Sequence, residues 1–148
     1  MKKLKLISIL SLLFVLNVAS MCSDDDDTST QVSNPTEIAS TLADGQWIVT
    51  LYKENDVVQT SNYSGYNFTF GADGALSATN GSTTQSGDWS TYTDSGYTKL
   101  DMMFTALDRP FEEISEDWRV ISRTTTKIEL KHISGGDGST DYLTFEKD

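Results

Sequence analysis

Apolar and polar residues alternate with a period of two over most of the chain beyond residue 45, as is typical of β-strands with one buried face. We expect strands near residues 46–54, 66–70, 76–78, 85–92, 97–105, 118–123, 127–133 and 143–145. Turn sequences such as Asp73-Gly74, Asn80-Gly81 and Ser95-Gly96 separate them and favour hairpins. The sequence therefore predicts an all-β fold, a small antiparallel up-and-down β-barrel of about eight strands.

A short helix is expected just before the first strand, over residues 35–42. Asn34 is placed to cap it, Pro35 occupies the first helical position and Glu37 the third, where acidic residues are favourable. Ile38 and Leu42 are four residues apart and so share one face of this helix. That face is expected to lie against the barrel.

The alternation also predicts which side chains face the interior of the barrel. In the first strand these are Trp47, Val49 and Leu51. The large aromatic side chains on the inner side are Trp47, Phe68, Phe70, Trp89, Phe104, Trp118 and Phe145. They are candidates either for the wall of a pocket for a small apolar ligand or for a closed core. An interior of eight strands is just wide enough for side chains or for one small ligand.

The N-terminus has the pattern of a secretory signal peptide. Lys2, Lys3 and Lys5 precede an apolar stretch from Leu6 to Leu16, which is too short for a membrane-spanning helix. It ends in Val18-Ala19-Ser20-Met21-Cys22, which resembles the cleavage motif of bacterial lipoproteins and implies a lipid on Cys22, the only cysteine. Met21 is larger than the residue that the motif prefers there, so an ordinary secretory cut after Ser20 remains the alternative.

An acidic block follows the cysteine directly, formed by Ser23, Asp24, Asp25, Asp26 and Asp27. It resembles the lipoprotein export signal of Bacteroidetes-type bacteria, which implies an outer-membrane lipoprotein exposed at the cell surface. The alternative is a solvated linker in a periplasmic or secreted protein. We thus divide the chain into a removed signal peptide (1–21), a flexible tether (22–34) and a barrel domain (35–148).

The charge balance narrows the set of partners. Loss of residues 1–21 leaves eight Lys and Arg against 22 Asp and Glu, a net charge of −14. Such a chain repels phosphate groups, so we expect no nucleic-acid partner, and membrane contact is expected through the N-terminal lipid.

No catalytic, metal or cofactor site is expected. Glu112, Glu113, Glu116 and Asp117 provide paired carboxylates of the kind used by glycosidases, but they fall on one polar connection that is expected to be a solvated loop. The single histidine, His132, has no cysteine partner for a typical zinc site, and a structural role is expected for it. The chain is not expected to be an enzyme.

A family resemblance adds to this interpretation. Gly45-Gln46-Trp47, the hairpin from Phe68 to Gly74, Gly87-Asp88-Trp89 and the closing Asp141 to Lys147 resemble the lipocalin-like domains of Bacteroidetes lipoproteins over residues 42–148. The resemblance implies that Trp47 lies at the closed end of the barrel, with Lys147 in place of the arginine that often covers this tryptophan. It also implies a small apolar or amphipathic ligand.

Two functional hypotheses therefore stand at this point. The chain is a surface-exposed, lipid-anchored lipocalin-like protein that binds such a ligand. Alternatively, it is a protein-interaction module with a closed core, acting as an accessory subunit of an outer-membrane surface complex.

Overall fold

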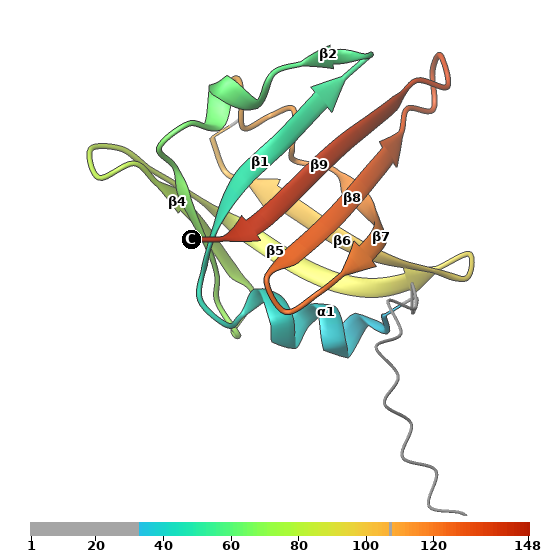
Figure 1. Cartoon of the computed structure of the whole chain (residues 1–148), viewed down its shortest axis with the longest axis horizontal. Coiled ribbons are helices and arrows are strands. Elements are labelled where there is room, and N and C mark those ends of the chain that lie inside the picture. Colours follow the sequence, from blue (N-terminus) through green and yellow to red (C-terminus); the bar gives the residue numbers. More distant parts are fainter. Residues whose placement is uncertain (1–32, 107) are drawn as a thin grey trace, which may run out of the picture.

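The computed structural model describes residues 33–106 and 108–148, and over these residues the chain forms a closed antiparallel barrel (Figure 1). Its eight strands are β1 (Gln46–Glu54), β3 (Asn67–Phe70), β4 (Ala75–Thr79), β5 (Thr84–Asp94), β6 (Tyr97–Phe104), β7 (Asp117–Arg123), β8 (Lys127–Ile133) and β9 (Thr140–Lys147). Consecutive strands pair with one another, and β9 pairs with β1 to close the barrel. The predicted fold class is confirmed.

The first strand differs from its prediction in which side chains are buried. Trp47 and Val49 face the interior as expected, but the pairing of β1 with β9 shifts between Val49 and Leu51. Such a bulge adds one residue to one strand and so reverses the alternation beyond it. As a result Tyr52, which is 1% exposed, takes the inner position that the alternation assigned to Leu51.

Helix α1 (Pro35–Leu42) covers one end of the barrel, where Figure 1 shows it lying across the strands. Its predicted bounds and cap are confirmed, since the Asn34 side-chain oxygen accepts a hydrogen bond from the Glu37 N–H at 3.0 Å. Ile38 and Leu42 are fully buried. Arg123 of β7 fastens the helix by donating to the Thr41 hydroxyl at 3.0 Å. This end is therefore closed by a packed element.

The opposite end is covered by two short segments. One is the 3₁₀-helix η1 (Thr60–Tyr63), which follows the two-residue strand β2 (Val57–Val58), and the other is the connection between β6 and β7. Phe111 and Ile114 of that connection are buried, and the Tyr63 hydroxyl donates to the Pro110 carbonyl at 2.8 Å. The connection was expected to be a solvated loop, but its apolar residues turn inward and close the barrel.

Residues 1–32 and 107 are not described. The predicted signal peptide, Cys22 and the block from Ser23 to Asp27 lie outside the described residues. Within the described part of the chain, no helix has the length and apolar character needed to cross a membrane.

Candidate functional site

The seven aromatic residues proposed for the interior are brought together there, and all are buried. Their exposures are Trp47 0%, Phe68 0%, Phe70 1%, Trp89 8%, Phe104 1%, Trp118 1% and Phe145 0%. The rings pack largely edge to face, a favourable arrangement for aromatic pairs. Phe145, for example, has its ring centroid 5.2 Å from that of Phe68 and 5.5 Å from that of Phe70.

The polar ends of the three tryptophans are satisfied within the fold. Each indole N–H donates to a backbone carbonyl: Trp47 to Leu42 at 2.9 Å, Trp89 to Gly71 at 2.9 Å, and Trp118 to Ile114 at 3.1 Å. Ligand pockets normally present a few polar groups that orient the ligand. These three donors are already used in holding the barrel together.

Trp47 also has the cover that the family resemblance implied. The Lys147 ammonium lies 5.6 Å from the centroid of the indole ring, within the range of a cation–π interaction. Asp44 accepts a hydrogen bond from the same ammonium at 2.7 Å, which lowers the pKa of the Asp44 carboxyl. Lys147 and Asp44 therefore hold the segment between α1 and β1 in place next to Trp47.

Carboxylates gather in a pocket of about 300 Å³ at the end opposite to α1. Six acidic residues line this acidic pocket, together with Arg109, His132 and several neutral residues. The acidic residues are Glu54, Glu112, Glu113, Glu116, Asp137 and Asp141. One arginine against six carboxylates leaves the pocket strongly negative.

Glu113 is a largely buried carboxylate of this pocket, and it forms an ion pair with Arg109. Its side chain is 8% exposed, and Oε1 lies 3.1 Å from an Arg109 nitrogen. The other oxygen, Oε2, is buried and has no hydrogen-bond partner. Burial raises the pKa of Glu113, and the charge of Glu54 raises it further, while Arg109 acts in the opposite sense. The burial of Glu113 was not expected from the sequence, because the polar connection that carries it was interpreted as a solvated loop.

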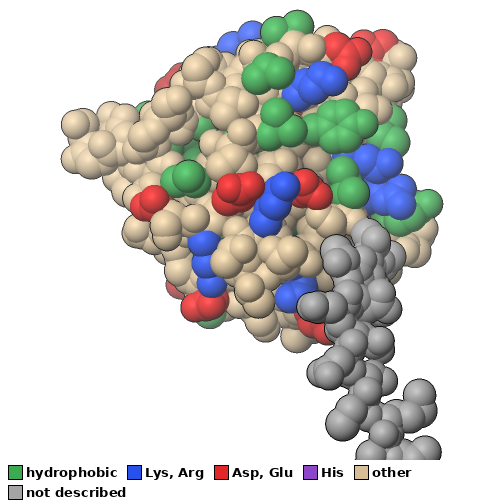
Figure 2. All heavy atoms as spheres, viewed as in Figure 1, with side chains coloured by type: hydrophobic (Ala, Val, Ile, Leu, Met, Phe, Trp, Pro, Cys, Tyr) green, Lys and Arg blue, Asp and Glu red, His purple; other side chains and the backbone are tan. Residues whose placement is uncertain are grey.

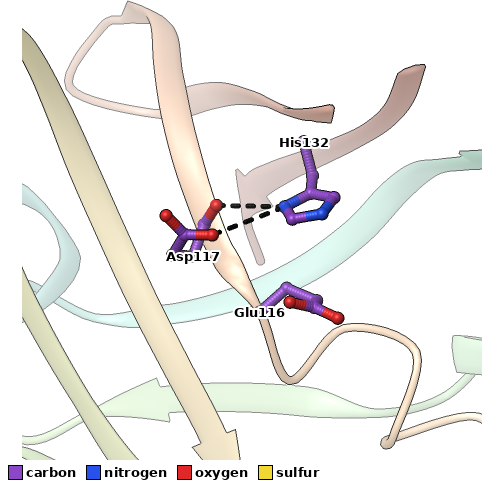
Figure 3. A group of neighbouring side chains, drawn as sticks. All are labelled: Glu116, Asp117 and His132. Atoms are coloured by element: carbon purple, nitrogen blue, oxygen red, sulfur yellow. Dashed lines mark hydrogen bonds and ion pairs between the residues drawn. The ribbon is translucent and has the colours of Figure 1, made fainter. Parts of the chain in front are cut away.

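Next to Glu113 in the same pocket, Glu116 and His132 meet Asp117 (Figure 3). One ligand-capable atom from each of the three residues lies within 4.8 Å of those of the other two. His132 Nδ1 is 3.2 Å from the Asp117 carbonyl oxygen and 3.6 Å from Asp117 Oδ1. The second oxygen of the Asp117 carboxylate accepts a hydrogen bond from Lys99 at 2.7 Å.

Glu116, Asp117 and His132 were recognisable in the sequence as candidate residues, but their proximity was not predicted. Asp117 begins β7 and His132 is near the end of β8, fifteen positions later. The hairpin register, in which Arg119 pairs with Lys131, is what makes them neighbours. The two strands were expected to be consecutive and antiparallel, so the proximity of Asp117 and His132 could have been predicted from the hairpin.

A second feature lies on the outer face of the barrel. Four cations and one tyrosine stand at directly opposed positions of neighbouring strands: Lys99 opposite Arg119, Arg119 opposite Lys131, Lys131 opposite Tyr142, and Tyr142 opposite Lys53. Opposed residues on one face have Cβ atoms about 4.5 to 5.5 Å apart. We call the continuous line from Lys99 to Lys53 the cationic row.

Two members of the cationic row have no carboxylate within ion-pair distance in the described part of the chain. Lys99 pairs with Asp117, and Lys53 pairs with Asp56 at 2.6 Å, but Arg119 and Lys131 form no such pair. The Arg119 guanidinium instead lies 3.2 Å from the centroid of the Tyr97 ring.

Apolar surface accompanies the cations of the row. Tyr97 is 41% exposed and Ile133 57%, and both line a shallow depression of about 290 Å³ together with Lys99, Arg119 and Lys131. Figure 2 shows Lys and Arg side chains beside hydrophobic ones on the right-hand side of this view, over β7 and β8. A wider depression, about 640 Å³, lies elsewhere, between α1 and Arg123, and it is an open surface formed mainly by helix residues.

Comparison with known proteins identifies the fold but no activity. No family model and no curated protein matches the sequence. Among solved structures, the barrel is similar to a DUF4847 family protein from Bacteroides vulgatus, with a TM-score of 0.51 and 16% sequence identity. The similarity covers 75% of this chain and 97% of that protein. At this level of identity, what the two chains share is the fold.

Proposed function

We propose that this chain is a lipid-anchored, surface-exposed interaction module that docks onto an acidic partner protein as an accessory subunit of an outer-membrane complex. Cys22 carries the lipid, and the block from Ser23 to Asp27 directs the chain to the cell surface. The barrel serves as a rigid scaffold with no catalytic activity. Binding of an apolar ligand inside the barrel is the rival hypothesis.

The packing of the interior favours docking over internal binding. The aromatic rings contact one another and the indole donors are used by backbone carbonyls. Helix α1 covers one end, and Phe111 and Ile114 close the other. An apolar ligand entering this barrel would have to displace packed side chains, which costs free energy in a core at native density.

The observation that carries the proposal is the cationic row. Like charges that face each other across two strands destabilise a sheet, and Arg119 and Lys131 do so without a carboxylate partner within the described residues. The chain has twice as many acidic as basic residues, 22 against 11, yet among the described residues no carboxylate lies within ion-pair distance of Arg119 or Lys131. An acidic partner would supply the missing counter-charges, and Tyr97 and Ile133 would supply apolar contact area.

We expect a photo-crosslinker at Ile133 to form a discrete protein adduct in intact cells. Replacing Lys131 with glutamine should reduce the adduct yield roughly fivefold, the equivalent of about 1 kcal/mol. Lys127→Gln is the matched control, because it removes one charge from the same strand but outside the row. The measurement is the adduct yield on immunoblots of the three proteins expressed at equal levels.

A crosslinker at Ser82, an exposed residue in the turn between β4 and β5, reports on non-specific contacts. Equal adduct yields from the Ile133 and Ser82 positions, or equal loss with Lys127→Gln and Lys131→Gln, would count against docking through the cationic row.

A further inference from the structure

We propose that a divalent cation binds at the edge of the acidic pocket, where it meets the depression lined by Asp117, with Glu116, Asp117 and His132 as its protein ligands. This site borders the cationic row, to which Lys99 belongs, but the proposal does not depend on the proposed docking function. The ion expected is Zn²⁺ or Mn²⁺, because imidazole and carboxylate groups bind Zn²⁺ and carboxylate groups also suit Mn²⁺.

The spacing of the ligand atoms fits a metal centre. Two ligands that each lie about 2.1 Å from a tetrahedral metal ion are about 3.4 Å apart. His132 Nδ1 and Asp117 Oδ1 are 3.6 Å apart, close to this spacing. One carboxylate oxygen of Glu116 lies within 4.8 Å of a ligand-capable atom of each of the other two residues, and Glu116 is exposed, so its side chain is free to rotate toward an ion (Figure 3).

The contacts that Asp117 already makes are compatible with this role. Lys99 binds only Oδ2 of the carboxylate, at 2.7 Å, so Oδ1 faces His132. A protein group that donates a hydrogen bond to the other oxygen of a metal-binding carboxylate fixes the orientation of that carboxylate. Lys99 is therefore a positioning residue for the proposed site.

A second observation, independent of the three ligands, also points to a cation. Glu113 Oε2 is buried in the wall of the same pocket without any hydrogen-bond partner. Burying a carboxylate oxygen without compensation is costly. A divalent ion in the pocket would offset part of this cost through its positive charge, and the pocket volume of about 300 Å³ is sufficient for an ion with its bound waters.

Zinc titration of the purified protein tests the proposal. We expect isothermal calorimetry to show one site that binds Zn²⁺. The variants His132→Ala and Glu116→Gln should each weaken binding by at least tenfold. Glu112→Gln is the matched control, because Glu112 lines the same pocket but is not one of the three ligands, and this variant should bind Zn²⁺ nearly as well as the wild type.

Trp118 provides a second readout that locates the ion. Its ring centroid is 5.9 Å from that of His132, so Co²⁺ bound at this site should quench Trp118 fluorescence, and Zn²⁺ should reverse the quenching by displacement. Trp118→Phe should abolish most of the quenching while leaving Zn²⁺ affinity in calorimetry unchanged. Circular dichroism of each variant verifies that the barrel is folded.

Three results would overturn the proposal. One is the absence of Zn²⁺ and Mn²⁺ binding at millimolar concentration. Another is wild-type affinity in a folded His132→Ala variant. The third is loss of binding on replacement of Asp24 to Asp27 with alanine, which would assign the ion to the acidic block instead.

Discussion

Replacing Trp47 with alanine is expected to lower the free energy of unfolding by about 3 to 5 kcal/mol, as truncation of a core aromatic residue usually does. Trp47 is fully buried, its indole N–H donates to the Leu42 carbonyl, and Lys147 covers its ring. Truncation would leave a cavity and an unpaired buried carbonyl next to α1. Because small domains have only about 5 to 15 kcal/mol of stability, the variant should be unfolded or close to it.

Urea denaturation followed by circular dichroism measures this loss. Tyr92→Ala is a suitable control, since Tyr92 is a large aromatic residue that is 39% exposed on β5, and its loss should change stability by less than about 1 kcal/mol. A Trp47→Ala protein that unfolds at the urea concentration of the wild type would contradict the place given to Trp47 in the core.

Replacing Cys22 with alanine is expected to move the protein entirely from the membrane fraction to the soluble fraction. Two or more acyl chains give stable anchoring, whereas a net charge of −14 in the chain beyond residue 21 disfavours binding to an anionic membrane surface. The variant should also lose all labelling by a fatty-acid analogue. Fractionation and labelling in cells are the measurements.

Changing Asp24 to Asp27 to alanine separates anchoring from export. This variant should keep its lipid and its membrane fractionation but become inaccessible to protease added to whole cells. If it remains accessible, the acidic block is a linker and does not act as an export signal. Membrane retention of Cys22→Ala would contradict the lipoprotein assignment itself.

The elements that are set by local sequence were predictable. The α1 bounds follow from Asn34, Pro35 and the spacing of Ile38 and Leu42, and all of these signals act within one or two helical turns. The alternation likewise placed β8 at Lys127–Ile133, as found. Where a half-buried strand contains no bulge, the two-residue period is sufficient to assign its faces.

The features that depend on contacts distant in sequence were not predictable in the same way. The bulge in β1 places Tyr52 instead of Leu51 in the interior of the barrel. It arises from pairing with β9, at the other end of the chain. The burial of Phe111 depends on contact with Tyr63, whose hydroxyl also donates to the Pro110 carbonyl. A polar connection between strands looks the same in sequence whether it is solvated or closes a barrel.

The candidate site was predictable only in part. The identity of His132, Glu116 and Asp117 was visible in the sequence, but their convergence required the register of β7 and β8. The cationic row required the register of five strands, because its members are between 11 and 89 positions apart along the chain but adjacent on the barrel surface.

The central claim is that the barrel interior is a closed core, and titration of the protein with a small apolar probe such as benzene tests it most directly. The wild type should show no saturable binding in calorimetry and no rise in melting temperature. Phe111→Ala, which removes a buried ring from the closing segment, should acquire binding, because an apolar cavity of this kind accepts benzene. Saturable binding to the wild type, with a rise in its melting temperature, would contradict the claim and favour an internal apolar ligand.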